Sequence, residues 1–115
     1  MTLMTSLEHV VTAAQHAEII ENNETVMICC GRMGPMCLPV YDAMDELQEE
    51  YPNIKFFDML FDSPEAAVIR SAPECAGFMG LPFTMYYKNG QVVKATSSIQ
   101  SKEQIKEILD EKLSL

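Results

Sequence analysis

Two short apolar runs, the first followed by a segment with helical spacing, constrain the fold of this chain more than any other feature. The runs "ETVMICC" and "NIKFFDMLFD" are rich in β-branched and aromatic residues, which is typical of strands buried on both faces. After the first run, Val40, Met44 and Leu47 recur at the spacing of one helical face,. Buried strands that alternate with helices predict a parallel sheet covered on both sides.

The segments around these strands also have helical spacing. Residues 6–21 predict a helix with Ser6 as its N-cap, and residues 63–80 predict a second helix, opened by Ser63 and interrupted by Pro73,. A last helix is expected over residues 101–113, because a serine precedes a run with apolar residues on one face,.

A β-hairpin is expected before the last helix. "PFTMYYKNGQVVKATSS" places an Asn-Gly turn between two β-rich runs,. The complete order is therefore α-β-α-β-α-β-β-α, which predicts an α/β fold with a central mixed sheet flanked by helices, formed as a single domain over residues 1–115.

Charge excludes two classes of partner. The chain has 8 basic and 17 acidic residues and a formal charge of −9, so it would repel a phosphate backbone or an anionic lipid surface. No secretory signal and no membrane-length apolar run is present. We expect a cytoplasmic protein with a protein or polypeptide partner, and neither nucleic acid nor a membrane as partner.

The four cysteines do not have the spacing of a zinc site or of a disulfide framework,. Cys29, inside an apolar run, is interpreted as a small buried side chain. Nine methionines, with Cys37, raise the alternative of a Cu(I) site,. Methionine is more often a filler of cores and apolar surfaces, so we expect neither a metal nor a cofactor.

The stretches "GFMGLPFTMYYKNGQVV" and "SKEQIKEILDEKL", taken with the element order, resemble the thioredoxin family over nearly the whole chain. The resemblance implies a thioredoxin-like fold and a thiol-disulfide oxidoreductase ancestry. It also implies that Pro82, after Leu81, is a cis-proline that faces the redox motif.

Two registers place the family's redox motif on this chain. One uses Met33 to Met36 and loses both thiols. The other uses Gly34-Pro35-Met36-Cys37 and lets the following helix continue without a gap to Tyr51. We choose the second register, in which Gly34 stands where the resemblance expects the nucleophilic cysteine and Cys37 where it expects the resolving one.

Three further positions depart from the family. Ile28 replaces a buried aspartate thought to accept a proton, Asp58 replaces its lysine partner, and Ser98 replaces a glycine that helps hold bound polypeptide. Asp58 is either a carboxylate at a strand edge or a buried acid with a raised pKa, and we favour the first. The two histidines, His9 and His16, are expected at the surface of the first helix.

Cys37 is the candidate catalytic residue, and two effects on its thiol oppose each other. A helix N-terminus and Arg32 favour the thiolate, whereas burial disfavours it; we expect the thiol to be accessible. Cys30 and Cys75 are possible disulfide partners, although neither spacing is that of a known redox pair. A lone thiol can attack a disulfide but stalls without a partner.

Two functions therefore remain open. The first is a thioredoxin-like protein of the thiol-disulfide oxidoreductase superfamily that acts, if at all, through Cys37. The second is a non-catalytic binding module that uses the groove around Pro82. In both hypotheses the motif and substrate groove consist of Met33, Gly34, Pro35, Met36, Met79, Leu81 and Pro82.

Overall fold

The computed structural model describes residues 3–77 and 80–113. Five strands form one sheet in the order β1-β3-β2-β4-β5. The strands are β1 (Glu8–Val10), β2 (Thr25–Gly31), β3 (Lys55–Leu60), β4 (Phe83–Lys88) and β5 (Gln91–Ser97), and the α-helices are α1 (Ala13–Asn22), α2 (Leu38–Glu50), α3 (Ala67–Arg70) and α4 (Lys102–Ile108).

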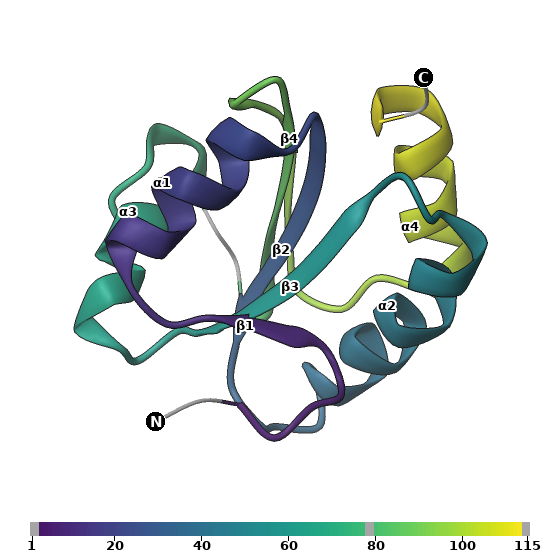
Figure 1. Ribbon diagram of the computed structural model, residues 1–115. Coiled ribbons are helices and arrows are strands. Elements are labelled where there is room, and N and C mark those ends of the chain that lie inside the picture. The colour runs from purple at the N-terminus through teal and green to yellow at the C-terminus, as the bar shows by residue number, and fades with distance from the viewer. Residues whose placement is uncertain (1–2, 78–79, 114–115) are drawn as a thin grey trace.

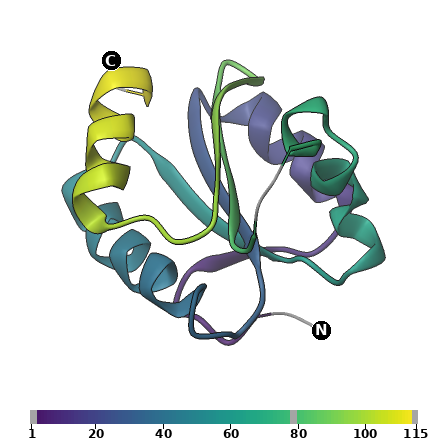
Figure 2. The ribbon, with the colours of Figure 1, turned by 180° about the vertical axis from the view of Figure 1, so that it is seen from behind.

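The sheet is mixed, as the sequence predicted. β1, β3 and β2 run parallel to one another, whereas β4 is antiparallel to both β2 and β5. Helices α1 and α3 lie on one side of the sheet, and α2 and α4 on the other (Figures 1 and 2). None of the helices in the described part of the chain is long and apolar enough to cross a membrane.

The N-terminal prediction was wrong in one respect. Residues 6–21 do not form a single helix: β1 comes first, and α1 begins only at Ala13 with Thr12 as N-cap. The β1 segment instead pairs in parallel with residues 57–59 of β3. Helix propensity is a weak preference that such a tertiary pairing overrides, so the sheet has five strands in place of the four expected.

The segment after β3 is also less helical than predicted. A 3₁₀ turn (Pro64–Ala66), the four-residue α3 and a second 3₁₀ turn (Pro73–Cys75) replace a continuous helix. Ser63 does act as the predicted N-cap, because its hydroxyl accepts a hydrogen bond from the Glu65 amide. Each proline lacks the amide proton that a longer helix would need, and so each begins a new short turn.

The local signals for the C-terminal half are confirmed. Asn89 and Gly90 both have positive φ angles, 52° and 80°, between β4 and β5, which is the conformation a two-residue hairpin turn requires. Ser101 caps α4, and the Gln104 side chain returns a bond to the Ser101 amide to complete a capping box. The chain continues beyond α4 as a short π-helix, Leu109–Leu113.

Two apolar clusters fill the two sides of the sheet, and they divide the cysteines between them. Cys29 and Cys37 belong to the cluster under α2 and α4. Cys30 and Cys75 belong to the cluster on the other side, under α1 and α3. This division follows from strand geometry, because the neighbouring side chains of β2 point to opposite faces.

Candidate functional site

The candidate site lies where β2 ends and the chain turns into α2 through residues 32–37, which we call the motif loop. Its centre is Gly31, the last residue of β2. A Cβ atom on Gly31 would lie 2.6 Å from Tyr41 Oη, 2.9 Å from Cys37 Sγ and 3.2 Å from Pro82 Cβ. Three side chains from separate elements therefore converge on a position where only hydrogen fits.

Cys37 is buried, in contrast to the accessibility predicted from the sequence. Only 2% of the residue is exposed. It occupies the N-cap position of α2 with helical backbone angles, and its amide bonds the Gly34 carbonyl at 3.0 Å. The sulfur accepts a hydrogen bond from the Arg32 amide at 3.4 Å. The thiol therefore points back into the end of β2 and away from solvent.

Tyr41, one turn into α2, packs against the end of β2 at Gly31. Its hydroxyl donates to the Arg32 carbonyl at 3.0 Å, so the Arg32 peptide is bound at its carbonyl by Tyr41 and at its amide by Cys37. Burial raises the pKa of Tyr41 well above its ordinary value, and the neighbouring Cys29 and Cys37 thiols act in the same direction. Tyr41 therefore remains a neutral donor.

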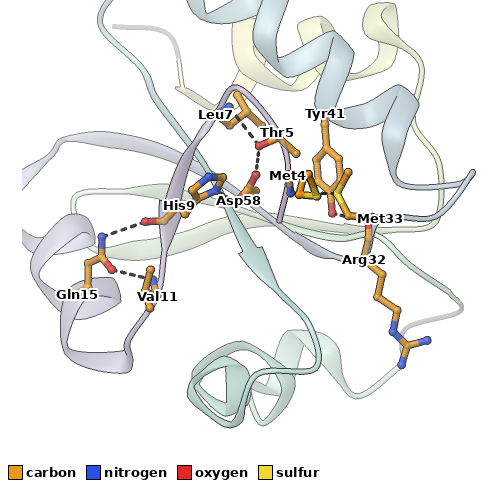
Figure 3. A network of polar contacts seen from close by, with 10 residues as sticks. All are labelled: Met4, Thr5, Leu7, His9, Val11, Gln15, Arg32, Met33, Tyr41 and Asp58. Carbon is orange, nitrogen blue, oxygen red and sulfur yellow. Dashed lines mark hydrogen bonds and ion pairs between the residues drawn. The ribbon is translucent and has the colours of Figure 1, made fainter. Parts of the chain in front are cut away.

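Arg32 does not direct its charge at the Cys37 thiol. Its guanidinium makes two bonds of 2.8 Å to the Asp62 carboxylate, which hold the pKa of that carboxyl below its usual range. The guanidinium also lies 5.8 Å from the centre of the Phe61 ring. Figure 3 shows the side chain extending away from Tyr41 and Met33, so the arginine assistance expected for Cys37 is directed elsewhere.

Gly34, the position where the resemblance places the nucleophilic cysteine, is open. Apart from its neighbours in the chain, no atom of residues 3–77 and 80–113 lies within 4 Å of the place that a Cβ on Gly34 would take. The methionines on either side, Met33 and Met36, are exposed by 43% and 46%, and Leu38 at the start of α2 by 39%. Pro35 is also exposed. The motif loop thus presents apolar side chains to solvent around an empty position.

The loop before β4 forms the other wall of the site. Its Leu81–Pro82 peptide bond is cis, Pro82 is buried, and Leu81 is half-buried. The Ser98 amide donates to the Gly80 carbonyl at 2.9 Å, and Ser98 itself has a positive φ of 69°. Met79, which was predicted to line this wall, lies outside the described residues.

A shallow groove continues from this end of the molecule between the first turns of α2 and α4. It is lined on one side by Pro39, Asp42 and Glu46, and on the other by Ile99 and Lys102. Ile99 is 44% exposed. Ile99 shares this groove with Pro39, which follows the exposed Leu38 at the start of α2.

The two cysteines predicted as partners of Cys37 are on the far side of the sheet. All four cysteines are free, and Cys30 and Cys75 lie in the opposite apolar cluster from Cys37. Burial raises the pKa of Cys30 to about 12 and that of Cys75 above its ordinary value. Cys29 shares the Cys37 side of the sheet, and burial raises its pKa well above the ordinary value.

Asp58 is fully buried, so the favoured prediction of a strand-edge carboxylate was wrong, and the alternative of a buried acid with a raised pKa is confirmed. β3 lies inside the sheet because β1 pairs along its outer edge. The Thr5 hydroxyl donates to one carboxylate oxygen, and His9 Nδ1 lies 2.6 Å from the other (Figure 3). Burial raises the pKa of this carboxyl, and the contacts from Thr5 and His9 lower it in part.

His16 is likewise buried and not at the surface as expected. Only 4% of it is exposed, and its Nε2 lies 2.9 Å from the Tyr87 hydroxyl. Burial lowers the pKa of His16 below 6.5. Among residues 3–77 and 80–113, no three His, Cys, Asp or Glu side chains are grouped so that they could hold a metal ion.

Sequence reasoning missed Tyr41 and the Thr5–His9–Asp58 cluster. The partners of Asp58 precede it by 53 and 49 residues, so no local pattern could connect them. One signal in the sequence could have indicated that the residues before β1 are buried, because Leu3 and Leu7 are four residues apart there. Both lie in the apolar cluster that contains Cys37.

Sequence comparison finds no relatives. No family model matches the chain, and no curated protein matches its sequence. Solved structures do match. A thioredoxin of Plasmodium falciparum has a TM-score of 0.75 at 21% identity, covering 92% of this chain and 99% of the other.

Two further structures give the same result. Thioredoxin O2 of Arabidopsis thaliana, in its oxidised state, has a TM-score of 0.76 at 10% identity over 99% of this chain and all of the other. Mitochondrial thioredoxin 3 of Saccharomyces cerevisiae, also oxidised, has a TM-score of 0.73 at 20% identity, with 91% and 95% covered. The chain therefore has the thioredoxin fold.

Proposed function

We propose that this chain is a thioredoxin-like protein of the thiol-disulfide oxidoreductase superfamily that binds polypeptides at its motif loop and has lost dithiol turnover. The observation that carries the proposal is the exposed apolar surface around a position without a thiol. Gly34 has open space where a side chain would be, and Cys37, three residues later, is buried. The surface is suited to contact, and the one motif thiol is not presented to a substrate.

The binding surface, which we call the apolar rim, consists of Met33, Met36, Leu38 and Ile99, all of which are exposed. Methionine side chains are flexible and polarisable, so they fit irregular apolar partners. Exposed apolar side chains that gather in one place indicate an interaction site. The nearby Pro82 loop and the groove beside Pro39 extend the surface on which a polypeptide would lie.

Binding is testable with an unfolded protein whose cysteines cannot react. Ribonuclease A that has been reduced and capped with neutral carbamidomethyl groups provides such a probe. Calorimetric titration should detect binding that the Met36→Ser variant weakens by about fivefold or more, since a central contact residue typically contributes over 1 kcal/mol. High salt should be present to screen the chain's net charge of −9,.

The matched control for this titration is Val68→Ser. Val68, on α3, is 36% exposed on the other side of the sheet, so its removal takes away a similar apolar contact far from the motif loop. Binding that is equally weak in both variants, or unchanged in Met36→Ser, would contradict the assignment of the apolar rim.

A second candidate function is attack by the single thiol of Cys37 on a partner's disulfide. The hydrogen bond from the Arg32 amide to Cys37 Sγ favours it, because it holds the sulfur beside the motif loop. The thiolate would form a mixed disulfide and release the other sulfur of the partner as a thiolate. An external thiol must then resolve that bond, since Gly34 supplies none.

Insulin reduction with dithiothreitol separates the two candidates. A chain that only binds polypeptides should be little faster than dithiothreitol alone, whereas attack by Cys37 would give an acceleration that Cys37→Ser abolishes. Gly34→Cys should accelerate the reaction, because a Cβ at position 34 meets no residue of the described chain within 4 Å beyond its two neighbours and the substitution adds the attacking thiol. Robust activity of the unaltered chain that persists after Cys37→Ser would show that neither the motif nor the thiol has been assigned correctly.

A further inference from the structure

The N-terminal residues 3–7 run beside the motif loop before they enter β1 (Figures 1 and 2). They form no helix or strand. Leu3 and Leu7 are 2% and 3% exposed and belong to the same apolar cluster as Cys37. The Met4 amide donates to Met33 Sδ at 3.3 Å. This segment, which we call the strap, thus contacts the motif loop through Met33 and adds two leucines to the apolar cluster in which Cys37 lies.

The middle of the strap is held by a buried polar clamp. The Thr5 hydroxyl donates to Asp58, and the same hydroxyl accepts the Leu7 amide at 3.2 Å. His9, at the start of β1, lies against the other carboxylate oxygen of Asp58. Figure 3 shows these side chains meeting on the inner side of the strap. The clamp therefore fixes the strap at one point, just where the strap turns toward β1.

We propose that the strap is a removable cover that controls access to the Cys37 thiol. Opening it breaks the contacts of Leu3, the Met4 bond and the Thr5 bond, whereas the pairing of β1 with β3 begins only at Glu8 and remains. Segments with few backbone hydrogen bonds open locally at far lower cost than the whole domain unfolds. Cys37 is then exposed while the sheet stays folded.

The strap and the apolar rim share Met33, but access to Cys37 is measured by alkylation without any polypeptide, so each proposal can fail without the other. While the strap is in place, Cys37 is buried, which suits a thiol that is kept from solvent until a partner displaces the strap. Met33 belongs to both surfaces, since its sulfur accepts the Met4 amide and its side chain is exposed. A polypeptide that binds at Met33 would compete with the strap there.

The test is the rate at which iodoacetamide alkylates Cys37 in the folded, full-length protein, with Cys30 as internal reference on the other side of the sheet. Leu3→Ser should raise the Cys37 rate at least about tenfold, since a large buried apolar side chain is lost from the closed state only. The Cys30 rate should not follow. Ser6→Ala changes an exposed strap residue and should leave both rates unchanged.

A second variant keeps the test informative if Leu3→Ser folds poorly. Thr5→Val preserves shape and removes the hydroxyl that joins the strap to Asp58, and it should also raise the Cys37 rate selectively. Equal acceleration of Cys37 and Cys30 in both variants would indicate global unfolding and overturn the proposal. Rapid alkylation of Cys37 in the unaltered chain, at the rate of an unfolded peptide, would overturn it as well.

Discussion

Substitution of Gly31 by alanine should destabilise the protein, whereas the same change at Gly34 should not. A methyl group on Gly31 would meet Tyr41 Oη at 2.6 Å, Cys37 Sγ at 2.9 Å and Pro82 Cβ at 3.2 Å. A methyl group on Gly34 would meet nothing within 4 Å among the described residues other than its chain neighbours. Neither glycine has a left-handed backbone, so the difference between the two variants reports packing alone.

The size of the effect follows from how firmly the three neighbours of Gly31 are held. Tyr41 is bound through its hydroxyl to the Arg32 carbonyl, Cys37 is fixed at the start of α2, and the proline ring of Pro82 is rigid. None can give way as a long flexible side chain would. Overpacking of this kind costs about 1–3 kcal/mol, or a fall of about 4–12 °C in Tm for a domain of this size.

Urea denaturation of both variants measures the prediction, with the free energy of unfolding as readout. Gly34→Ala should be neutral or more stable by up to about 1 kcal/mol, because alanine restricts the unfolded chain. A loss below about 0.5 kcal/mol for Gly31→Ala would refute the convergence on Gly31. An equal loss in both variants would refute the claim that position 34 is open.

Two further predictions concern stability away from the motif loop. Burial places the pKa of His16 below its unfolded value of 6.5, so the unfolded state binds the proton first on acidification, and the free energy of unfolding should fall as the pH drops below 6.5. His16→Gln should remove this pH-dependent component. Identical pH profiles of the two proteins in denaturant titrations would contradict the prediction. Ser101→Ala should cost about 1 kcal/mol in urea denaturation through loss of the α4 cap,, whereas Ser6→Ala should cost nothing measurable; equal losses would show that the cap contributes nothing.

The features predicted correctly from the sequence are those with a local cause. The turn at Asn89 and Gly90 needs only two residues that tolerate positive φ, and the cap of α4 needs only Ser101 and Gln104. The three-residue strand β1 was missed because its stability comes from pairing with β3, far along the chain, and not from its own residues.

The same distinction explains the errors in the site. The burial of Asp58 depends on β1 covering the edge of β3 and on partners about fifty residues earlier. His16 is buried against Tyr87, 71 residues later. For Cys37, the local sequence correctly predicted a position at the N-terminus of a helix. Its burial was not predicted, because the strap that contributes to the surrounding cluster precedes the thiol by about thirty residues.

The central claim is that polypeptides bind at the apolar rim, and residue-resolved NMR tests it most directly. Carbamidomethylated ribonuclease A, added to the ¹⁵N-labelled protein, should shift the amide signals of Met33, Met36, Leu38 and Ile99, which carry the exposed apolar side chains of the rim. Signals from α1 and from the hairpin turn at Asn89, at the other end of the sheet, should stay in place. Shifts centred on those distant elements, or no shifts at probe concentrations that saturate known polypeptide-binding domains, would contradict the claim.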